Sequence, residues 1–97
     1  MEIAIVTGAT KGIGLEIAQT LRDAGYFVIG TYVRDYDPEF ISALQTQNFI
    51  LKQVDASDYD AVKAFSTEVK KEFGNITVLS ESDGVLPELY SPLSLML

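Results

Sequence analysis

The stretch that decides the fold is TGATKGIG at residues 7–14, which places three glycines at positions 8, 12 and 14. It follows the run IAIV at residues 3–6, whose lack of polar alternation predicts a strand with both faces buried. After the glycines, apolar residues recur at helical spacing until the glycine at position 25, at Ile13, Ile17, Ala18 and Leu21. The pattern therefore predicts a strand, a tight glycine loop and a helix.

Each glycine of this stretch suits a particular task. Gly8 lets the chain turn sharply, Gly12 lets the backbone approach a diphosphate, and Gly14 lets the helix pack closely on the strand. The N-terminus of the helix adds N–H groups and a partial positive charge, which favour a bound phosphate. Lys11 precedes Gly12 instead of following it, so the stretch is not a Walker A loop. A tight strand-to-helix turn without a ligand is the alternative.

Three more strands and two more helices are expected. Apolar runs predict strands at residues 27–32, 49–54 and 76–79. The pair Asp37-Pro38 predicts a helix that runs to about Gln47, and Ser57 with Asp60 resembles the capping box of a further helix. The apolar faces of these helices would comprise Phe40, Ile41 and Leu44 in the first and Val62, Phe65, Val69 and Phe73 in the second.

The alternation of strands and helices selects a parallel sheet with right-handed crossovers. We therefore predict an α/β fold, a Rossmann-like parallel sheet with helices on both faces and about four strands in the order 3-2-1-4. Residues 1–80 would form this nucleotide-binding half-domain. Residues 81–97 form an apolar tail, to which the pattern assigns no regular element because Gly84, Pro87 and Pro92 interrupt it.

The composition excludes several kinds of binding partner and catalytic site. A formal charge of −7 repels phosphate backbones, so no nucleic-acid partner is expected. The sequence has no cysteine and no histidine, so disulfides, histidine-based triads and thiolate or imidazole metal sites are excluded, and no metal is expected. No apolar run approaches the roughly 20 residues of a membrane helix, and the first residues include no basic signal region. We therefore expect a cytoplasmic protein without a membrane partner.

The form of the glycine stretch, T-G-x-x-x-G-x-G, resembles that of the short-chain dehydrogenase/reductase family, and the resemblance continues in register through Leu79. Residues 7–14 and the sequence VIGT at residues 28–31 are most similar to the 3-oxoacyl-carrier-protein and acetoacetyl-CoA reductases of this family. The resemblance implies that the chain corresponds to the N-terminal, dinucleotide-binding half of a reductase. Its full-length relatives are expected to reduce the carbonyl group of a 3-oxoacyl thioester with NADPH.

The resemblance also implies cofactor contacts at matching positions. The diphosphate would lie against the glycine stretch, at Gly8, Thr10, Lys11, Gly12, Ile13 and Gly14. Many relatives end the second strand with an acidic residue that holds the ribose diol of NAD, whereas this chain has Tyr32 there. Lys11 and Arg34 suit a 2′-phosphate instead, so NADP(H) is favoured over NAD(H). The alternative for Arg34 is a solvated loop cation.

Of two further segments, one matches the family and the other departs from it. Asp55 and Ala56 match the family segment beside adenine, in which the carboxylate accepts from the amino group of the base. A local role for Asp55, at the start of the next helix, is compatible with that one. After the fourth strand the family has Asn-Asn-Ala-Gly, whereas this chain has ESDG at residues 81–84. Two alignments stay open here, one with three substitutions around a retained glycine and one with the motif deleted.

No catalytic residue is assigned in this chain. The family's catalytic serine and its Tyr-x-x-x-Lys pair have no counterpart in the sequence. Tyr59 and Lys63 match that spacing by residue type, but they fall in the helix after the third strand, far from the expected position of a nicotinamide. A structural role is therefore expected for both.

Three functions are consistent with this pattern. The first is a truncated reductase that binds NADP(H) without turnover of its own. The alternative is a non-catalytic binding or assembly module that self-associates through the open edge of the fourth strand and the apolar tail, and a homo-oligomer is expected on this ground. The third is activity in trans, with a second polypeptide that supplies the catalytic half.

Overall fold

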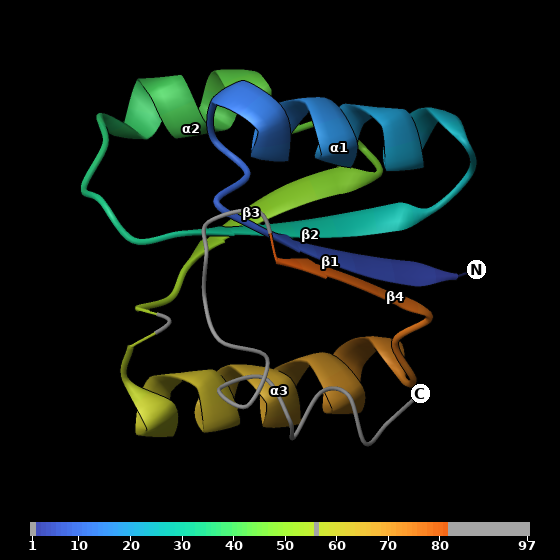
Figure 1. Ribbon diagram of the computed structural model, residues 1–97, viewed down its shortest axis with the longest axis vertical. Coiled ribbons are helices and arrows are strands. Elements are labelled where there is room, and N and C mark those ends of the chain that lie inside the picture. The colour runs from blue at the N-terminus through green and yellow to red at the C-terminus, as the bar shows by residue number, and fades with distance from the viewer. Residues whose placement is uncertain (1, 56, 82–97) are drawn as a thin grey trace.

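The computed structural model describes residues 2–55 and 57–81, which form three layers with a sheet between helices (Figure 1). The elements in chain order are β1 (Ile3–Thr7), α1 (Gly12–Asp23), β2 (Phe27–Tyr32), α2 (Pro38–Leu44), β3 (Phe49–Gln53), α3 (Tyr59–Phe73) and β4 (Val78–Glu81). Helices α1 and α2 cover one face of the sheet, and α3 covers the other. The strands are parallel in the order β3-β2-β1-β4, so the predicted α/β architecture is confirmed.

Strand β1 lies inside the sheet, and all five of its residues are buried. Ile3 and Ile5 belong to the apolar cluster on the side of α3, whereas Ala4 and Val6 belong to the cluster on the side of α1 and α2. Successive side chains of a strand point to opposite faces, and here both faces are covered by helices. The unbroken apolar sequence of β1 follows from this double burial.

The start of α3 differs from the prediction that Ser57 caps it. The N-cap residue is Asp58, whose carboxylate accepts a hydrogen bond from the backbone N–H of Ala61 at 3.2 Å. The Ser57 hydroxyl donates instead to Asp55 Oδ1 at 2.7 Å. The capping-box interpretation was therefore wrong by one residue, whereas the predicted apolar face is confirmed, since Val62, Phe65 and Val69 are buried and Phe73 packs against them.

Helix α2 ends at Leu44, three residues before the predicted end at Gln47. The cause is a competing set of hydrogen bonds to the next strand. Gln45 is extended, and its side-chain oxygen accepts from the backbone N–H of Leu51 at 2.9 Å, while the N–H of Thr46 donates to the oxygen of Phe49 at 2.9 Å. These bonds pair backbone groups on the outer edge of β3, with which no other described strand forms a ladder.

Strand β4 begins at Val78, two residues after the predicted start. Ile76 is only 1% exposed and packs into the cluster on the side of α3 before the strand pairing with β1 begins. The predicted half-domain of residues 1–80 stops one residue short of the end of β4, and the tail from residue 82 onward lies outside the described residues. None of the described helices has the length and apolar character needed to cross a membrane.

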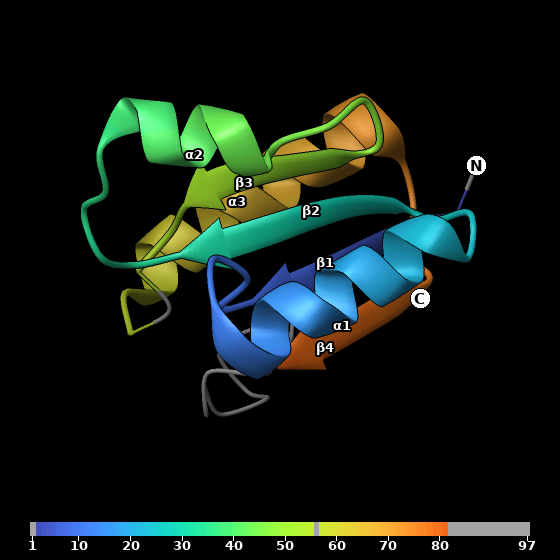
Figure 2. The same cartoon turned by 90° about the horizontal axis from the view of Figure 1, so that it is seen from above.

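The carboxyl ends of all four strands meet at one edge of the sheet, as the arrowheads in Figure 2 show. The loop from β1 to α1 begins at this edge, and the loop from β2 to α2 lies beside it. In open parallel sheets ligands bind outside this edge, because the loops there surround a crevice. The fold therefore places residues 8–11 and residues 33–37 at the expected binding position.

Candidate functional site

The loop between β1 and α1 depends on glycine at two positions. Gly8 and Gly12 have positive φ angles of 61° and 59°, a backbone conformation that other residues adopt at a cost. A Cβ atom added to Gly12 would meet no protein atom within 4 Å. The backbone at Gly12 therefore borders open space, and a side chain there would project into room that a ligand needs.

The N-terminus of α1 differs from those of the other described helices. Lys11 is its N-cap residue and makes no side-chain capping bond, and the first turn contains no acidic residue. By contrast, the carboxylates of Asp37 and Asp58 cap α2 and α3. Because the first N–H groups of α1 have no capping side chain, they remain available to an anion, and the helix dipole favours one.

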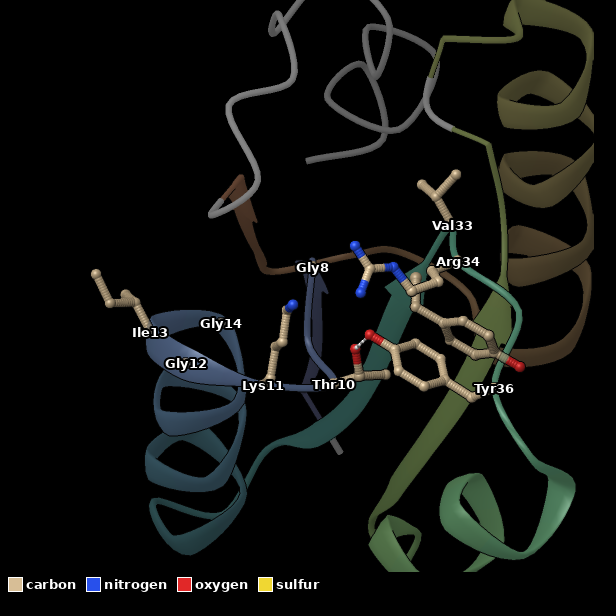
Figure 3. Close-up of a pocket in the computed structure, with 10 residues that line it drawn as sticks. Gly8, Thr10, Lys11, Gly12, Ile13, Gly14, Val33, Arg34 and Tyr36 are labelled. Atoms are coloured by element: carbon tan, nitrogen blue, oxygen red, sulfur yellow. Dashed lines mark hydrogen bonds between the residues drawn. The ribbon is translucent and has the colours of Figure 1, made fainter.

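A cavity of about 690 Å³ opens beside this helix end, a size within the usual range of ligand pockets. Seven of the nine predicted cofactor residues line it, namely Gly8, Thr10, Lys11, Gly12, Ile13, Gly14 and Arg34. Three others, Tyr32, Val33 and Tyr36, complete the described lining. The glycine loop and the segment after β2 thus form one pocket (Figure 3).

The pocket is locally positive in an acidic chain. Lys11 and Arg34 are among its described lining residues, and none of those lining residues is acidic. Figure 3 shows the Lys11 ammonium and the Arg34 guanidinium extending into the same space above the glycine loop. Since the whole chain carries a formal charge of −7, this local excess of positive charge singles out the pocket as the place for an anionic ligand.

Tyr36 ties the two sides of the pocket together, and the sequence reasoning did not identify it. Its hydroxyl accepts a hydrogen bond from the Thr10 hydroxyl at 3.0 Å. Its ring contacts those of Tyr32 and Phe40, with centroids 5.7 and 5.0 Å away. The backbone N–H of Ala9 adds a bond to the oxygen of Thr31 at 3.0 Å. No periodic signal in the sequence marks a loop residue of this kind. The one signal is its place four residues after Tyr32, another tyrosine that its ring could contact.

Ile13 does not belong to the apolar face of α1 that its spacing suggested. Its side chain is 72% exposed and points away from the other labelled residues of the pocket (Figure 3). Gly14 and Ala18 are the buried residues of this helix, and Ile17 and Leu21 pack against the cluster below it. Ile13 therefore borders the pocket because it lies in the first turn of α1, although its side chain points away from the other labelled lining residues.

Asp55 lies apart from this pocket, just beyond the end of β3. It borders a second cavity of about 210 Å³ between β3 and α3. Its Oδ1 accepts from the hydroxyl of Ser57 at 2.7 Å and from the N–H of Ser57 at 2.9 Å. These two bonds favour the ionised form and hold the pKa of Asp55 below its ordinary value. Ala56, the other residue predicted here, lies outside the described residues.

Tyr59 and Lys63 occupy the first two turns of α3, which covers the opposite face of the sheet from α1. Tyr59 is half exposed, and neither residue is among the described residues that line the pocket at the glycine loop. The resemblance of this pair to a Tyr-x-x-x-Lys motif is thus one of spacing.

Comparisons with known proteins agree with this geometry. The family model described as short chain dehydrogenase matches residues 2–94. The 3-oxoacyl-acyl-carrier-protein reductase of Haemophilus influenzae is 34% identical over 84 residues, which cover 87% of this chain and 35% of that protein. The acetoacetyl-CoA reductase of Paracoccus denitrificans is also 34% identical over 84 residues, which cover 87% of this chain and 34% of that protein. The chain spans about a third of the length of these relatives.

Solved structures give the same picture. The ligand-free aldohexose dehydrogenase of Thermoplasma acidophilum superposes with a TM-score of 0.69 at 32% identity, over 84% of this chain and 29% of that one. A metagenomic short-chain oxidoreductase in complex with NADP superposes with a TM-score of 0.69 at 33% identity, over 80% of this chain and 37% of that one.

Proposed function

We propose, since this chain belongs to the short-chain dehydrogenase family, that the pocket at its glycine loop binds NADP(H). The observation that carries the proposal is the N-terminus of α1, which has neither a capping side chain nor an acidic residue in its first turn and which lines a pocket with two cations. The N–H groups of residues 12–14 would bind the diphosphate, and the bare backbone of Gly12 would let it approach.

The preference for NADP(H) over NAD(H) is argued from charge. The 2′-phosphate that distinguishes NADP(H) is an anion, and Arg34 can donate two parallel hydrogen bonds to it while Lys11 adds a second positive charge. β2 ends with Tyr32, so no carboxylate stands at the last position of the strand to accept from a ribose diol. The presence of NADP in the metagenomic relative agrees with this preference.

For the adenine end we propose Asp55. Its carboxylate is exposed and has a lowered pKa, so it is an ionised acceptor at neutral pH, and the amino group of adenine is a donor. Oδ1 already accepts two bonds from Ser57, which restrain the carboxylate, so Oδ2 is the oxygen that we propose for the adenine amino group. The same bonds give Asp55 its structural role at the turn before α3.

A dinucleotide bound in this pocket would supply a hydride for the reduction of a carbonyl carbon. From the similarity to these reductases we infer that an enzyme built on this half-domain reduces a 3-oxoacyl thioester. We propose that the described residues bind and orient the cofactor, and we assign none of them a catalytic role. The 97 residues by themselves are therefore expected to bind NADPH without oxidising it.

The test is a calorimetric titration of the chain with NADPH and, separately, with NADH. We expect tighter binding of NADPH, and about a tenfold or greater loss of that affinity in Arg34→Ala, with NADH binding changed little, because only the 2′-phosphate pairs with the guanidinium. Equal affinities for the two dinucleotides would remove the NADP(H) preference, and absence of binding would remove the site. NADPH oxidation after addition of a partner polypeptide and 3-oxoacyl thioester would favour activity in trans.

A second candidate, self-association, is favoured by one observation. Among the described strands β4 pairs only with β1, so no described strand pairs with its other edge, and open strand edges of this kind favour pairing with another chain. We propose that this edge joins two copies of the chain in a homo-oligomer. Sedimentation at tens of micromolar should give a mass above that of one chain, and a monomeric mass would contradict the proposal.

A further inference from the structure

We propose that Gln53 sets the preference of the pocket for a 2′-phosphate by holding the Asp35 carboxylate away from it, an inference that rests on the NADP(H) site proposed above. Gln53 is the last residue of β3 and lies opposite Tyr32, the last residue of β2, in the parallel ladder. Its side chain is therefore beside the loop that carries Arg34 out of β2.

The amide group of Gln53 binds both neighbours of Arg34. Its Nε2 donates to the backbone oxygen of Val33 at 3.0 Å and to Asp35 Oδ1 at 2.7 Å. Both partners are oxygen atoms that only accept, so the amide nitrogen and not the amide oxygen faces them. The two hydrogens of one NH2 group thus fix the backbone before Arg34 and the side chain after it.

The result is that two adjacent, oppositely charged side chains are separated. Arg34 lines the pocket, whereas Asp35 is not among the described lining residues. The guanidinium of Arg34 extends toward the space above the glycine loop in Figure 3. Within residues 2–55 and 57–81 it makes no hydrogen bond or ion pair, so its donors remain for a ligand.

This separation bears directly on the choice between the two dinucleotides. A carboxylate beside the ribose accepts from the diol of NAD(H) and repels a 2′-phosphate, whereas a guanidinium attracts the phosphate. Asp35 follows the end of β2 by three residues, so it is close enough in the chain to take either position. Without Gln53 its carboxylate would be free to face the ribose or to pair with Arg34, and both changes oppose binding of the 2′-phosphate.

The experiment compares the ratio of the NADH and NADPH dissociation constants in the wild-type chain, Gln53→Met, Asp35→Asn and the double variant. Methionine keeps the length of the side chain and removes its donors. We expect Gln53→Met to lower the preference for NADPH about tenfold, the effect of one charge-assisted hydrogen bond. Asp35→Asn should restore the preference in the Gln53→Met background, because the freed side chain then has no charge.

The outcomes separate this proposal from the one on which it rests. An unchanged ratio in Gln53→Met, with both dinucleotides bound, would overturn the role of Gln53 and leave the NADP(H) site in place. An equal loss of affinity for both dinucleotides, or no rescue by Asp35→Asn, would reduce Gln53 to a support of the loop and overturn it as well. No binding by the wild-type chain would overturn both proposals. Gln53→Ala replaces the methionine variant if circular dichroism shows that the latter is unfolded.

Discussion

The Thr10 hydroxyl donates a hydrogen bond to the Tyr36 hydroxyl at 3.0 Å, across 26 positions of the sequence. Thr10 belongs to the glycine loop and is buried, whereas Tyr36 belongs to the loop between β2 and α2. This bond joins the segment proposed for the diphosphate to the segment proposed for the 2′-phosphate. The two halves of the pocket are therefore expected to respond together when the bond is removed.

Tyr36→Phe removes the bond and keeps the ring contacts. We expect a loss of about 1 kcal/mol in the free energy of unfolding, the usual contribution of one hydrogen bond, and a several-fold weaker affinity for NADPH. Urea denaturation and calorimetric titration measure the two effects. Tyr59→Phe is the matched control, because it removes a hydroxyl from a half-exposed ring away from the pocket, and it should change neither quantity. Equal effects of the two substitutions would contradict the assigned role of Tyr36.

Gly30→Ala tests how closely the glycine loop packs on β2. An added Cβ would lie 2.6 Å from the Cβ of Ala9 and 2.8 Å from Cδ2 of Leu51, both closer than real Cβ contacts. We expect a destabilisation of about 1 to 3 kcal/mol, as for other overpacked cores. Ala9→Gly in the same chain should recover part of it, because one of the two clashes disappears. The same loss in both backgrounds would place the strain elsewhere.

The pKa of Asp55 makes a pH-dependent prediction. Bonds from Ser57 lower the folded-state pKa below the ordinary value of 3.8, so the carboxylate contributes stability above that value and loses its contribution as the pH falls through the folded-state pKa. Titration of the carboxyl carbon by NMR should give a midpoint below 3.8. Ser57→Ala removes the hydrogen bond from the Ser57 hydroxyl, the larger of the two effects that lower this pKa, and should raise the midpoint toward the ordinary value. An unchanged midpoint in this variant would exclude that cause.

Gln45→Ala tests the side-chain hydrogen bond that joins the C-cap residue of α2 to β3. The side-chain oxygen of Gln45 accepts from the backbone N–H of Leu51 on the outer side of β3. Its loss should cost about 1 kcal/mol and speed hydrogen exchange at the Leu51 amide. Gln47→Ala is the control, since Gln47 is exposed and should leave that amide unchanged. Equal exchange rates in the two variants would show that the side-chain bond does not protect the strand.

The fold could be predicted because its signals are periodic or positional. The unbroken apolar sequence of β1 and the face of α3 at Val62, Phe65 and Val69 reflect burial by regular elements, and positive φ angles require the glycines at positions 8 and 12. The strand order then followed from the short, right-handed connections of a parallel sheet. These signals also indicated residues of the glycine stretch and the segment after β2 that the structure brings together around one cavity, because the carboxyl ends of parallel strands lie together.

The remainder depends on contacts between side chains that are distant in sequence. The bond between Gln53 and Asp35 and the bond between Thr10 and Tyr36 connect different loops, and neither loop has a repeating pattern. The start of α3 was predicted one residue too early for a related reason. Ser57 and Asp58 are both good capping residues, and only the bond from Ser57 to Asp55 decides between them. Local propensity ranks such candidates but does not choose among them.

The most direct test of the NADP(H) site is the NADPH dissociation constant of Gly12→Val beside that of Gly25→Val. Both glycines have positive φ angles, 59° and 103°, so both substitutions strain the backbone, and a Cβ at either position would meet no protein atom within 4 Å. Only Gly12 lines the pocket. We predict that Gly12→Val loses NADPH binding at least a hundredfold while Gly25→Val, if folded, keeps it, since a side chain that occupies the place of the diphosphate removes several interactions at about tenfold each. Wild-type affinity in Gly12→Val would contradict the account.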